Sequence, residues 1–479
     1  MDKNLFQERI RSLSSSFPYI ESRTAEAFGK ALTELDNWEL YRINPIQFAA
    51  DRGMNPDEIV NLFVCAARIG LFDLTWDLIC PVCSGLLSTD QVISHLNRES
   101  FHCAYCHVDL PVILDDYIEI TFTVNPEVYQ ININPYHDHD TFRQAFFSRN
   151  FKFPKVTIKT ILQCHIEFFF VWPEKYETYE FELKPERMYR LISIKINSGV
   201  SLITDNSEAS SGTQTVHIHG DSGKFSPEEV RLHPGQVKLY VHNAHSSPID
   251  ILIFEADYPL LHKLEKDYPP IIAPFLTGKM LLNNQAFRSL FKMQELATDL
   301  RISVRSLTML FTDLKGSTKL YDTVGDMRAY RLIQNHFSLL EESARKYAGA
   351  IVKTMGDAIM ASFSEPGNGV MAAVDMMKNI CNMPEDENGK LGLKIGLHEG
   401  PALTVNNDGR LDYFGQTVNI AARVQGLAQA GEIWLSDSVF HGTNVNEPLQ
   451  ANGYTYEARS VKLKGVGHHA KVYMCKKNS

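Results

Sequence analysis

Two short apolar runs that each lead into an aspartate constrain the fold of this chain more than any other feature. TMLFTD ends at Asp313, and AIVKTMGDAIMASF turns back on itself at Gly356 and Asp357. Apolar runs of this length predict strands, and a glycine permits the tight turn in the second run. Both carboxylates are therefore expected at strand ends of a rigid sheet, where oxygen ligands bind hard cations such as Mg²⁺. Taken singly, either aspartate reads as an ordinary turn residue.

The segment after the first aspartate offers a second kind of binding group. It contains Gly316, Ser317 and Thr318, and a helix is expected to begin shortly after them. The backbone N–H groups at such a turn lack intrahelical partners and suit a triphosphate. These three residues are therefore candidates for substrate binding.

The motifs FTDLKGST, KTMGDAIMASF and LDYFGQTVNIAARVQ occur in this order, and together they resemble the catalytic domain of class III nucleotidyl cyclases. The resemblance covers about residues 305–473, a little over a third of the chain. It implies an α+β, ferredoxin-like fold (βαββαβ) for a catalytic domain at 305–479. The expected elements are a strand at 306–313, a helix at 323–348, a hairpin at 350–363, a helix at 367–381, a strand at 391–399, a helix at 416–428 and a strand at 432–436.

The chemistry that the resemblance implies is attack of a ribose 3′-hydroxyl on the α-phosphorus, with two divalent cations, Mg²⁺ or Mn²⁺, in each active site. Asp313 and Asp357 match the two metal-binding aspartates, and the carbonyl of Leu314 matches the backbone ligand. Asn419 and Arg423 lie four residues apart, on one face of the expected helix. They match the catalytic pair that orients the ribose and stabilises the transition state.

Nucleotide recognition follows from three further matches to the family. Lys464 matches the lysine that holds the terminal phosphates, whereas Val466 stands where the family has a second basic residue. Lys353 and Asp412 match the pair that selects adenine. A lysine donates to adenine N1 and an aspartate accepts from N6, whereas guanine presents the opposite edge and calls for a glutamate. ATP is therefore the expected substrate.

The family also implies an assembly. The metal aspartates and the Asn/Arg helix belong to opposite ends of the pocket, and two copies assemble head to tail. Because one chain here holds every element, a symmetric homodimer with two equivalent sites is expected. Two alternatives stay open: a guanylate cyclase, or a catalytically silent nucleotide-binding signalling scaffold. A silent copy would normally lose a metal aspartate or the Asn/Arg pair, and this chain keeps them all.

Four cysteines in the first quarter of the chain have the spacing of a zinc ribbon. Nineteen residues separate one CxxC pair from the other, and the cysteines are Cys80, Cys83, Cys103 and Cys106. Four thiolates leave no open coordination position, so one structural Zn²⁺ per chain is expected. The alternative is four unrelated buried cysteines. The whole arrangement also resembles bacterial cyclases with a zinc-ribbon-containing N-terminal region.

The sequence divides the remainder into a helical region with the ribbon at 1–114, a β-rich regulatory part at 115–260 and a helical linker at 261–304. The β-rich part is expected to be sandwich-like, and residues 225–254 faintly resemble cupredoxin-like sandwiches. Its histidine pairs, His137 with His139 and His217 with His219, could bind metal but read as ordinary surface residues. The signal that residues 1–300 sense, a ligand or a protein, is not specified by the sequence.

Composition limits the classes of protein that this chain can belong to. A net charge of −10 argues against a nucleic-acid-binding protein. Two helices around Gly53 could form a helix-turn-helix, but the second is acidic at its start and apolar along its length, which favours a buried pair. No apolar run approaches the roughly 20 residues of a membrane span, and no signal peptide is apparent. Eight cysteines in so long a chain are no disulfide scaffold, so a cytoplasmic, reduced protein is expected.

Overall fold

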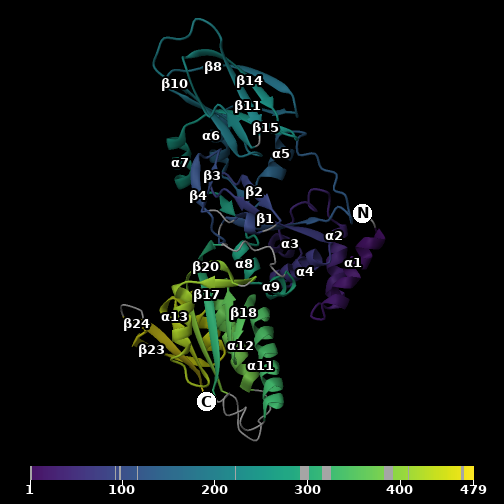
Figure 1. Cartoon of the computed structure of the whole chain (residues 1–479), viewed down its shortest axis with the longest axis vertical. Coiled ribbons are helices and arrows are strands. Elements are labelled where there is room, and N and C mark those ends of the chain that lie inside the picture. Colours follow the sequence, from purple (N-terminus) through teal and green to yellow (C-terminus); the bar gives the residue numbers. More distant parts are fainter. Residues whose placement is uncertain are drawn as a thin grey trace.

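The computed structural model describes residues 3–91, 93–96, 99–115, 117–221, 223–291, 301–315, 325–381, 392–407, 409–464 and 469–478 (Figure 1). Gly316, Ser317, Thr318 and Val466 lie outside these residues. Among the helices of the described part, none is long and apolar enough to cross a membrane.

The chain begins with helices that pack on a small sheet. The helices are α1 (Lys3–Ser16), α2 (Ser22–Thr33), α3 (Pro45–Asp51) and α4 (Pro56–Arg68). The side chain of Asn55 caps α4 by accepting from the backbone of Asp57 and Glu58, at 2.9 and 3.1 Å. Seven residues of α4 are buried, so the helix pair around Gly53 packs in the core, as the apolar sequence of its second helix indicated.

The small sheet has the order β2-β1-β5 and carries the first CxxC pair, whereas the second pair lies on a separate two-stranded hairpin, β3-β4. Its neighbourhood comprises β1 (Phe72–Ile79), β2 (Leu86–Asp90), the 3₁₀ helix η1 (Ile93–Leu96), β3 (Ser100–Cys103), β4 (Val108–Pro111) and β5 (Ile118–Val124). β5 pairs antiparallel with β1 from Phe72↔Val124 to Leu78↔Ile118. Since β5 follows residue 114, the sheet crosses the division expected between 114 and 115.

Two sheets in the middle of the chain enclose one apolar core, at the top of Figure 1. One sheet has the order β13-β10-β9-β15-β7 and the other β12-β11-β14-β8. Their strands are β7 (His165–Val171), β8 (Tyr176–Leu183), β9 (Met188–Ser193), β10 (Ser198–Thr204), β11 (Gln214–Asp221), β12 (Lys224–Ser226), β13 (Glu229–Leu232), β14 (Gly235–Asn243) and β15 (Ile249–Glu255). Around them lie α5 (His139–Phe146), β6 (Phe151–Lys152), α6 (Lys155–Cys164), α7 (Tyr258–Asp267) and β16 (Ile271–Ile272).

The C-terminal third forms an eight-stranded sheet with the order β18-β19-β17-β20-β22-β24-β23, and β21 pairs with the end of β20. The strands are β17 (Arg301–Lys315), β18 (Gly349–Met355), β19 (Ala358–Phe363), β20 (Gly392–Asn407), β21 (Arg410–Phe414), β22 (Glu432–Ser436), β23 (Tyr454–Lys462) and β24 (His469–Lys477). The helices are α11 (Asp326–Lys346), α12 (Pro366–Cys381), α13 (Gln416–Gln425), α14 (Asp437–Phe440) and α15 (Asn446–Ala451). The first six elements, β17-α11-β18-β19-α12-β20, follow a βαββαβ order.

In the described part of the expected helical linker at 261–304, the end of α7 is followed by two short helices, α8 (Gly278–Leu282) and α9 (Gln285–Leu290). Asn284 lies between them and caps α9, because its side chain accepts from the backbone N–H of Phe287 at 2.9 Å. Residues 292–300 of the linker lie outside the described part.

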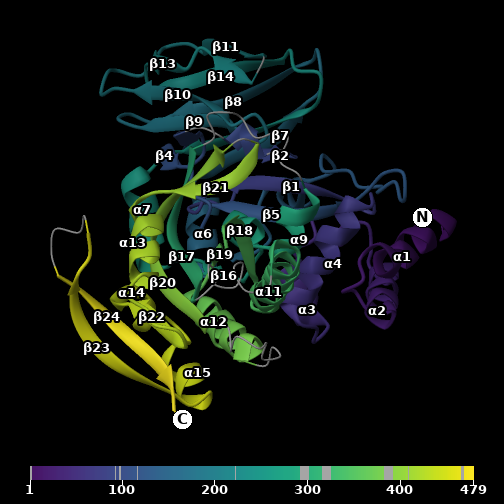
Figure 2. The same cartoon turned by 60° about the horizontal axis from the view of Figure 1, so that its bottom comes forward.

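The front helices and the C-terminal sheet share one continuous hydrophobic core. Side chains of α2, α4, β1 and β5 pack in the same cluster as buried residues of β17, β20 and β21. The backbone N–H of Leu114 donates to the carbonyl of Ser303 at 3.1 Å, and that of Arg305 donates to Asp115 at 2.6 Å. The front half is therefore packed onto the sheet that carries the candidate site (Figures 1 and 2).

Candidate functional site

The two candidate metal aspartates lie at the same end of neighbouring strands. Asp313 is near the end of β17, and Asp357 follows Gly356, whose φ of +65° makes the turn between β18 and β19. β17 pairs antiparallel with β19 up to Phe311↔Met360, and continuing this register brings residue 357 opposite 314. This is the arrangement that the two apolar runs predicted.

Asp313 has a partner that the sequence analysis missed. Lys394 on β20 pairs with Asp313 in the β17–β20 register, and its Nζ lies 2.5 Å from Oδ2 of Asp313. The two residues are 81 positions apart, so only the pairing of the strands could reveal the contact. One carboxylate oxygen of Asp313 is held by an ammonium, which leaves the other for a cation.

Asp357 offers an oxygen with no partner. Its Oδ2 is buried and accepts no hydrogen bond within the described part of the chain, and both ring nitrogens of His336 are buried and unpaired in the same way. Burial lowers the pKa of His336 to about 4, against the pull of the Asp357 charge, so this ring is neutral near pH 7. Two carboxylates and the Leu314 carbonyl form a donor set of hard oxygens, and an orphaned buried oxygen among them fits a divalent cation.

The two candidate base-selecting residues form a close ion pair. Nζ of Lys353 lies 2.6 Å from Oδ2 of Asp412, which also accepts from the side-chain amide of Asn407 at 3.1 Å. Burial by itself raises the pKa of Asp412, but the hydrogen bonds from Lys353, Tyr413 N–H and Asn407 outweigh it and lower the pKa. Asp412 is therefore an ionised acceptor at neutral pH, and β18 bulges between Ile351 and Lys353 to present the lysine.

The helix with the candidate catalytic pair is seated very closely on the sheet. A Cβ at Gly396 of β20 would lie 2.1 Å from the backbone nitrogen of Gln425, so only glycine admits α13 at this distance. Asn419 on α13 is exposed and Arg423 is half-buried. Within the described residues, no hydrogen bond or ion pair joins either of them to Asp313 or Asp357.

Gly396→Ala is expected to lower the free energy of unfolding by about 1–3 kcal/mol, because the added methyl group forces α13 away from β20. Urea unfolding of the full chain measures the change. Gly212→Ala is the matched control, since a Cβ there meets no atom within 4 Å. Equal stability of the two variants would contradict the close seating of α13.

Lys464, the candidate phosphate ligand, is exposed and follows the end of β23. No hydrogen bond or ion pair joins it to the other described site residues, and its neighbours at 465–468 lie outside the described part. Its role therefore stays a prediction.

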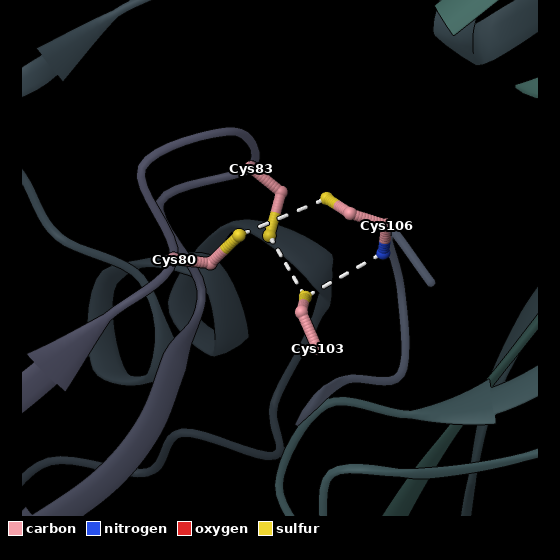
Figure 3. Close-up of side chains that lie close together, drawn as sticks. All are labelled: Cys80, Cys83, Cys103 and Cys106. Atoms are coloured by element: carbon pink, nitrogen blue, oxygen red, sulfur yellow. Dashed lines mark hydrogen bonds between the residues drawn. The ribbon is translucent and has the colours of Figure 1, made fainter. Parts of the chain in front are cut away.

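The four cysteines of the two CxxC pairs come together as the spacing predicted (Figure 3). All four sulfurs lie within 4.8 Å of one another, with Cys80 3.8 Å from Cys106 and Cys83 3.7 Å from Cys103. A tetrahedral zinc with Zn–S bonds of about 2.3 Å sets its sulfurs about 3.8 Å apart. The arrangement therefore fits one closed four-thiolate site.

Backbone groups around the cluster also suit thiolates. The N–H of Gly85 donates to Sγ of Cys83 at 3.4 Å, and the N–H of Cys106 donates to Sγ of Cys103 at 3.5 Å. Hydrogen bonds from the other thiols, that of Cys106 above all, hold the pKa of Cys103 well below its ordinary value. In the part of the chain that the structure describes, this is the one group of three or more His, Cys, Asp or Glu side chains placed to hold a metal, and the histidine pairs join no such group.

Two family models match the chain. The model described as a family of unknown function, DUF5939, matches residues 13–289, and the model of the adenylate and guanylate cyclase catalytic domain matches residues 302–477. The first assigns no function to the region with the cysteine cluster. The second covers every candidate residue of the nucleotide site.

Curated relatives match the same C-terminal part. An adenylate cyclase of Anabaena cylindrica is 29% identical over 36% of this chain and 37% of its own length, and one of Lachancea kluyveri is 31% identical over 27% and 8%. The rat guanylate cyclase 2G is 28% identical over 36% of this chain and 16% of its own length. The chain thus spans about a third or less of the length of these relatives.

Solved structures of cyclases match about the same share of this chain as the curated relatives do. The adenylyl cyclase CyaB from P. aeruginosa is 22% identical, with a TM-score of 0.31, over 37% of this chain and 97% of that chain. The guanylate cyclase domain from Catenaria anguillulae in complex with GTP is 20% identical, with a TM-score of 0.32, over 37% and 99%.

Proposed function

We propose that this chain, which belongs to the DUF5939 family of unknown function and ends in an adenylate and guanylate cyclase catalytic domain, converts ATP into 3′,5′-cyclic AMP and pyrophosphate. The observation that carries the choice of ATP is the ion pair between Lys353 and Asp412, at 2.6 Å. Both groups are charged and adjacent, so together they offer one donor and one acceptor to the edge of a base. Adenine, with an acceptor at N1 and a donor at N6, complements this pair.

In the proposed reaction the 3′-hydroxyl oxygen of the ribose forms a bond to the α-phosphorus. The bond from that phosphorus to the bridging oxygen breaks, its electron pair leaves with pyrophosphate, and the hydroxyl proton passes to solvent. Asp313, Asp357 and the Leu314 carbonyl would hold two Mg²⁺ or Mn²⁺ ions, which supply positive charge to the nucleophile and the phosphates. Arg423 stabilises the charge on the α-phosphoryl group, Asn419 orients the ribose, and Lys464, with residues 316–318, holds the terminal phosphates.

We infer that the active form is a homodimer. Among the described residues of one chain, no hydrogen bond or ion pair joins Asn419 or Arg423 to the aspartates, and Asn419 is exposed. A second copy placed head to tail would bring its own α13 to the aspartates of the first, and two-fold symmetry would then give two equal pockets. We read the βαββαβ arrangement of this domain as ferredoxin-like, and the front half as its regulatory part.

The full-length chain is expected to turn over ATP with a kcat/KM about tenfold or more above that for GTP, because GTP would place a donor against the Lys353 ammonium. Lys353→Glu should reverse the polarity of this position and lower ATP turnover by about tenfold or more, since it also leaves two acids in contact. Coupled assays of pyrophosphate release from each nucleotide measure both quantities.

Lys378→Glu is the matched control for this substitution. It makes the same change of charge on an exposed position of α12 and should leave both rates unchanged. Turnover of GTP equal to or faster than ATP by the unmodified chain would instead identify a guanylate cyclase. Turnover of neither nucleotide, with Mg²⁺ or Mn²⁺ present, would favour a silent nucleotide-binding protein.

A further inference from the structure

The short helix α9 contacts the strand that carries Lys353. The side-chain carbonyl oxygen of Gln285 accepts from the backbone N–H of Ile351 at 2.8 Å. β18 is an edge strand of the described sheet, and Ile351 is where its bulge begins, two residues before Lys353. An edge amide that points away from the sheet depends on such a partner for its position. Gln285 therefore fixes the backbone from which Lys353 projects.

The same helix contacts the strand that carries Asp412. The guanidinium of Arg288 donates to the carbonyl of Leu411 at 2.7 Å and lies 5.7 Å from the centre of the Tyr413 ring. Leu411 and Tyr413 are the two neighbours of Asp412 in β21. The planar guanidinium of Arg288 thus bonds one neighbour of Asp412 and lies near the ring of the other. These two contacts restrict the position of Asp412.

The front half of the chain holds α9 in place. The side chain of Asn284 donates to Asn61 of α4 at 2.8 Å, and the ring of Phe287 packs edge-on against buried Trp76 of β1, with centroids 6.0 Å apart. Phe287 is itself 4% exposed. α9 is thus anchored to α4 and β1 on one side and bonded to β18 and β21 on the other (Figure 2).

We propose that Gln285 and Arg288 are positioning residues for the Lys353–Asp412 pair, so that the front half of the chain sets nucleotide affinity and base choice through α9. This inference rests on the proposed function. The pair spans two strands that are not hydrogen-bonded to each other, since β18 pairs with β19 and β21 with β20. Their separation is therefore set by what bridges them, and α9 contacts both.

The effect should appear in substrate recognition more than in the chemical step. Within the described residues, α9 makes no hydrogen bond to β17 or α13, the elements of Asp313, Asn419 and Arg423. A displaced α9 would loosen the contacts with the base and leave the groups around the α-phosphorus in place. Loss of binding that is equal in the ground state and the transition state raises KM and leaves kcat unchanged.

Arg288→Ala in the full chain is expected to raise the KM for ATP about tenfold and to lower the preference for ATP over GTP by a similar factor, with kcat within about threefold. Gln285→Ala should act in the same direction, more weakly, because its bond is neutral. Arg288→Lys keeps one donor and should fall between Arg288→Ala and the unmodified chain. Arg23→Ala, which removes an exposed arginine of α2, should change none of these quantities.

A substitution in α11 separates the two contacts of Gln285. Its side-chain nitrogen donates to Glu341 of α11 at 3.2 Å, whereas its oxygen accepts from Ile351. Glu341→Ala, at an exposed position of α11, removes the bond to α11 and leaves the acceptor of Gln285 for Ile351, without placing two acids in contact. It should therefore retain the KM and the base preference of the unmodified chain. If it behaves as Gln285→Ala, the contact with α11 is the important one, and the proposal is wrong.

Hydrogen exchange tests, without reference to activity, whether α9 holds β18 and β21 in place. In Gln285→Ala and Arg288→Ala, amides of 349–355 and 410–414 should exchange about tenfold faster, while those of 432–436 stay protected. Unchanged exchange in both segments overturns the proposal, even if the chain turns over neither nucleotide and the proposed function fails. Faster exchange with unchanged base preference also overturns it, because α9 would then stabilise the strands without positioning the pair.

Discussion

Asp357→Ala and Arg423→Ala homodimers are each expected to lose about 10²-fold or more of the cyclase activity, because each removes a charged group that faces the developing negative charge. A mixture of the two variants is expected to regain activity. If each pocket takes its metal ligands from one chain and Arg423 from the other, a mixed dimer collects both lesions in one pocket and neither in the second. Its rate should reach up to about half that of the unmodified dimer.

Co-expression of the two variants with different affinity tags isolates the mixed dimer for this assay. Asp313→Ala mixed with Asp357→Ala is the matched control, since both lesions lie on the metal side and no pocket is complete. Tandem-purified mixed dimers that stay inactive in the first pairing would show that the shared-pocket arrangement is wrong. Equal recovery in both pairings would contradict the assignment of Arg423 and the aspartates to different chains.

Loss of the zinc cluster is expected to have the second large effect, on stability. Cys106→Ser removes one of four thiolates, and structural Zn²⁺ in small domains contributes on the order of 10 kcal/mol of apparent binding free energy. Zinc content should fall from about one ion per chain to nearly none. The segments around 80–85 and 103–108 should lose their protection from hydrogen exchange, whereas 306–313 in β17 should keep its own.

The hydrogen bonds of the cysteine cluster indicate which neighbouring segments should lose structure when the cluster is lost. The side chain of Asn197, in the turn between β9 and β10, accepts from the N–H of Ala104 at 2.9 Å and donates to the carbonyl of His102 at 2.6 Å. The guanidinium of Arg190 donates to the carbonyl of Ala104 at 3.1 Å. The knuckle of Cys103 and Cys106 is thus bonded to β9 and the β9–β10 turn, and its collapse should release these contacts.

Cys164→Ser is the control for this experiment. Cys164 is half-buried at the end of α6 and lies outside the cluster, so its removal should leave the zinc content unchanged. Elemental analysis of the unmodified chain, purified without chelator, provides the direct check. Protein that is folded and free of metal under those conditions would contradict a structural zinc site.

The contacts of α9 with β18 and β21 connect the front half directly to the nucleotide site. A signal that shifts α4 or β1 would move Phe287 and Asn284, and through Gln285 and Arg288 it would move the base-selecting pair. Packed cores transmit such shifts because their side chains fill the available space. Among the described residues, α9 makes no hydrogen bond to the four cysteines, so the integrity of the cluster and base choice are expected to respond to different substitutions.

The features that the sequence alone predicted are those decided within a few residues. An apolar run that ends in Gly356-Asp357 can only turn there, and a CxxC pair presents two sulfurs to one side of a knuckle. The buried helix pair around Gly53 was predicted in the same way, and Asn55 caps the start of its second helix, α4. Each of these depends on backbone conformation and on the chemistry of adjacent side chains, which any stretch of sequence carries with it.

Tertiary structure decided what depends on pairing between distant segments. The ion pair of Lys394 with Asp313 follows from the register of β17 against β20, and the sheet that joins β1 to β5 crosses an expected domain boundary. The short helix α9 places Gln285 against β18 and Arg288 against β21. No local pattern encodes these contacts, because they depend on which apolar faces bury each other across the fold, and that choice is made by the whole core at once.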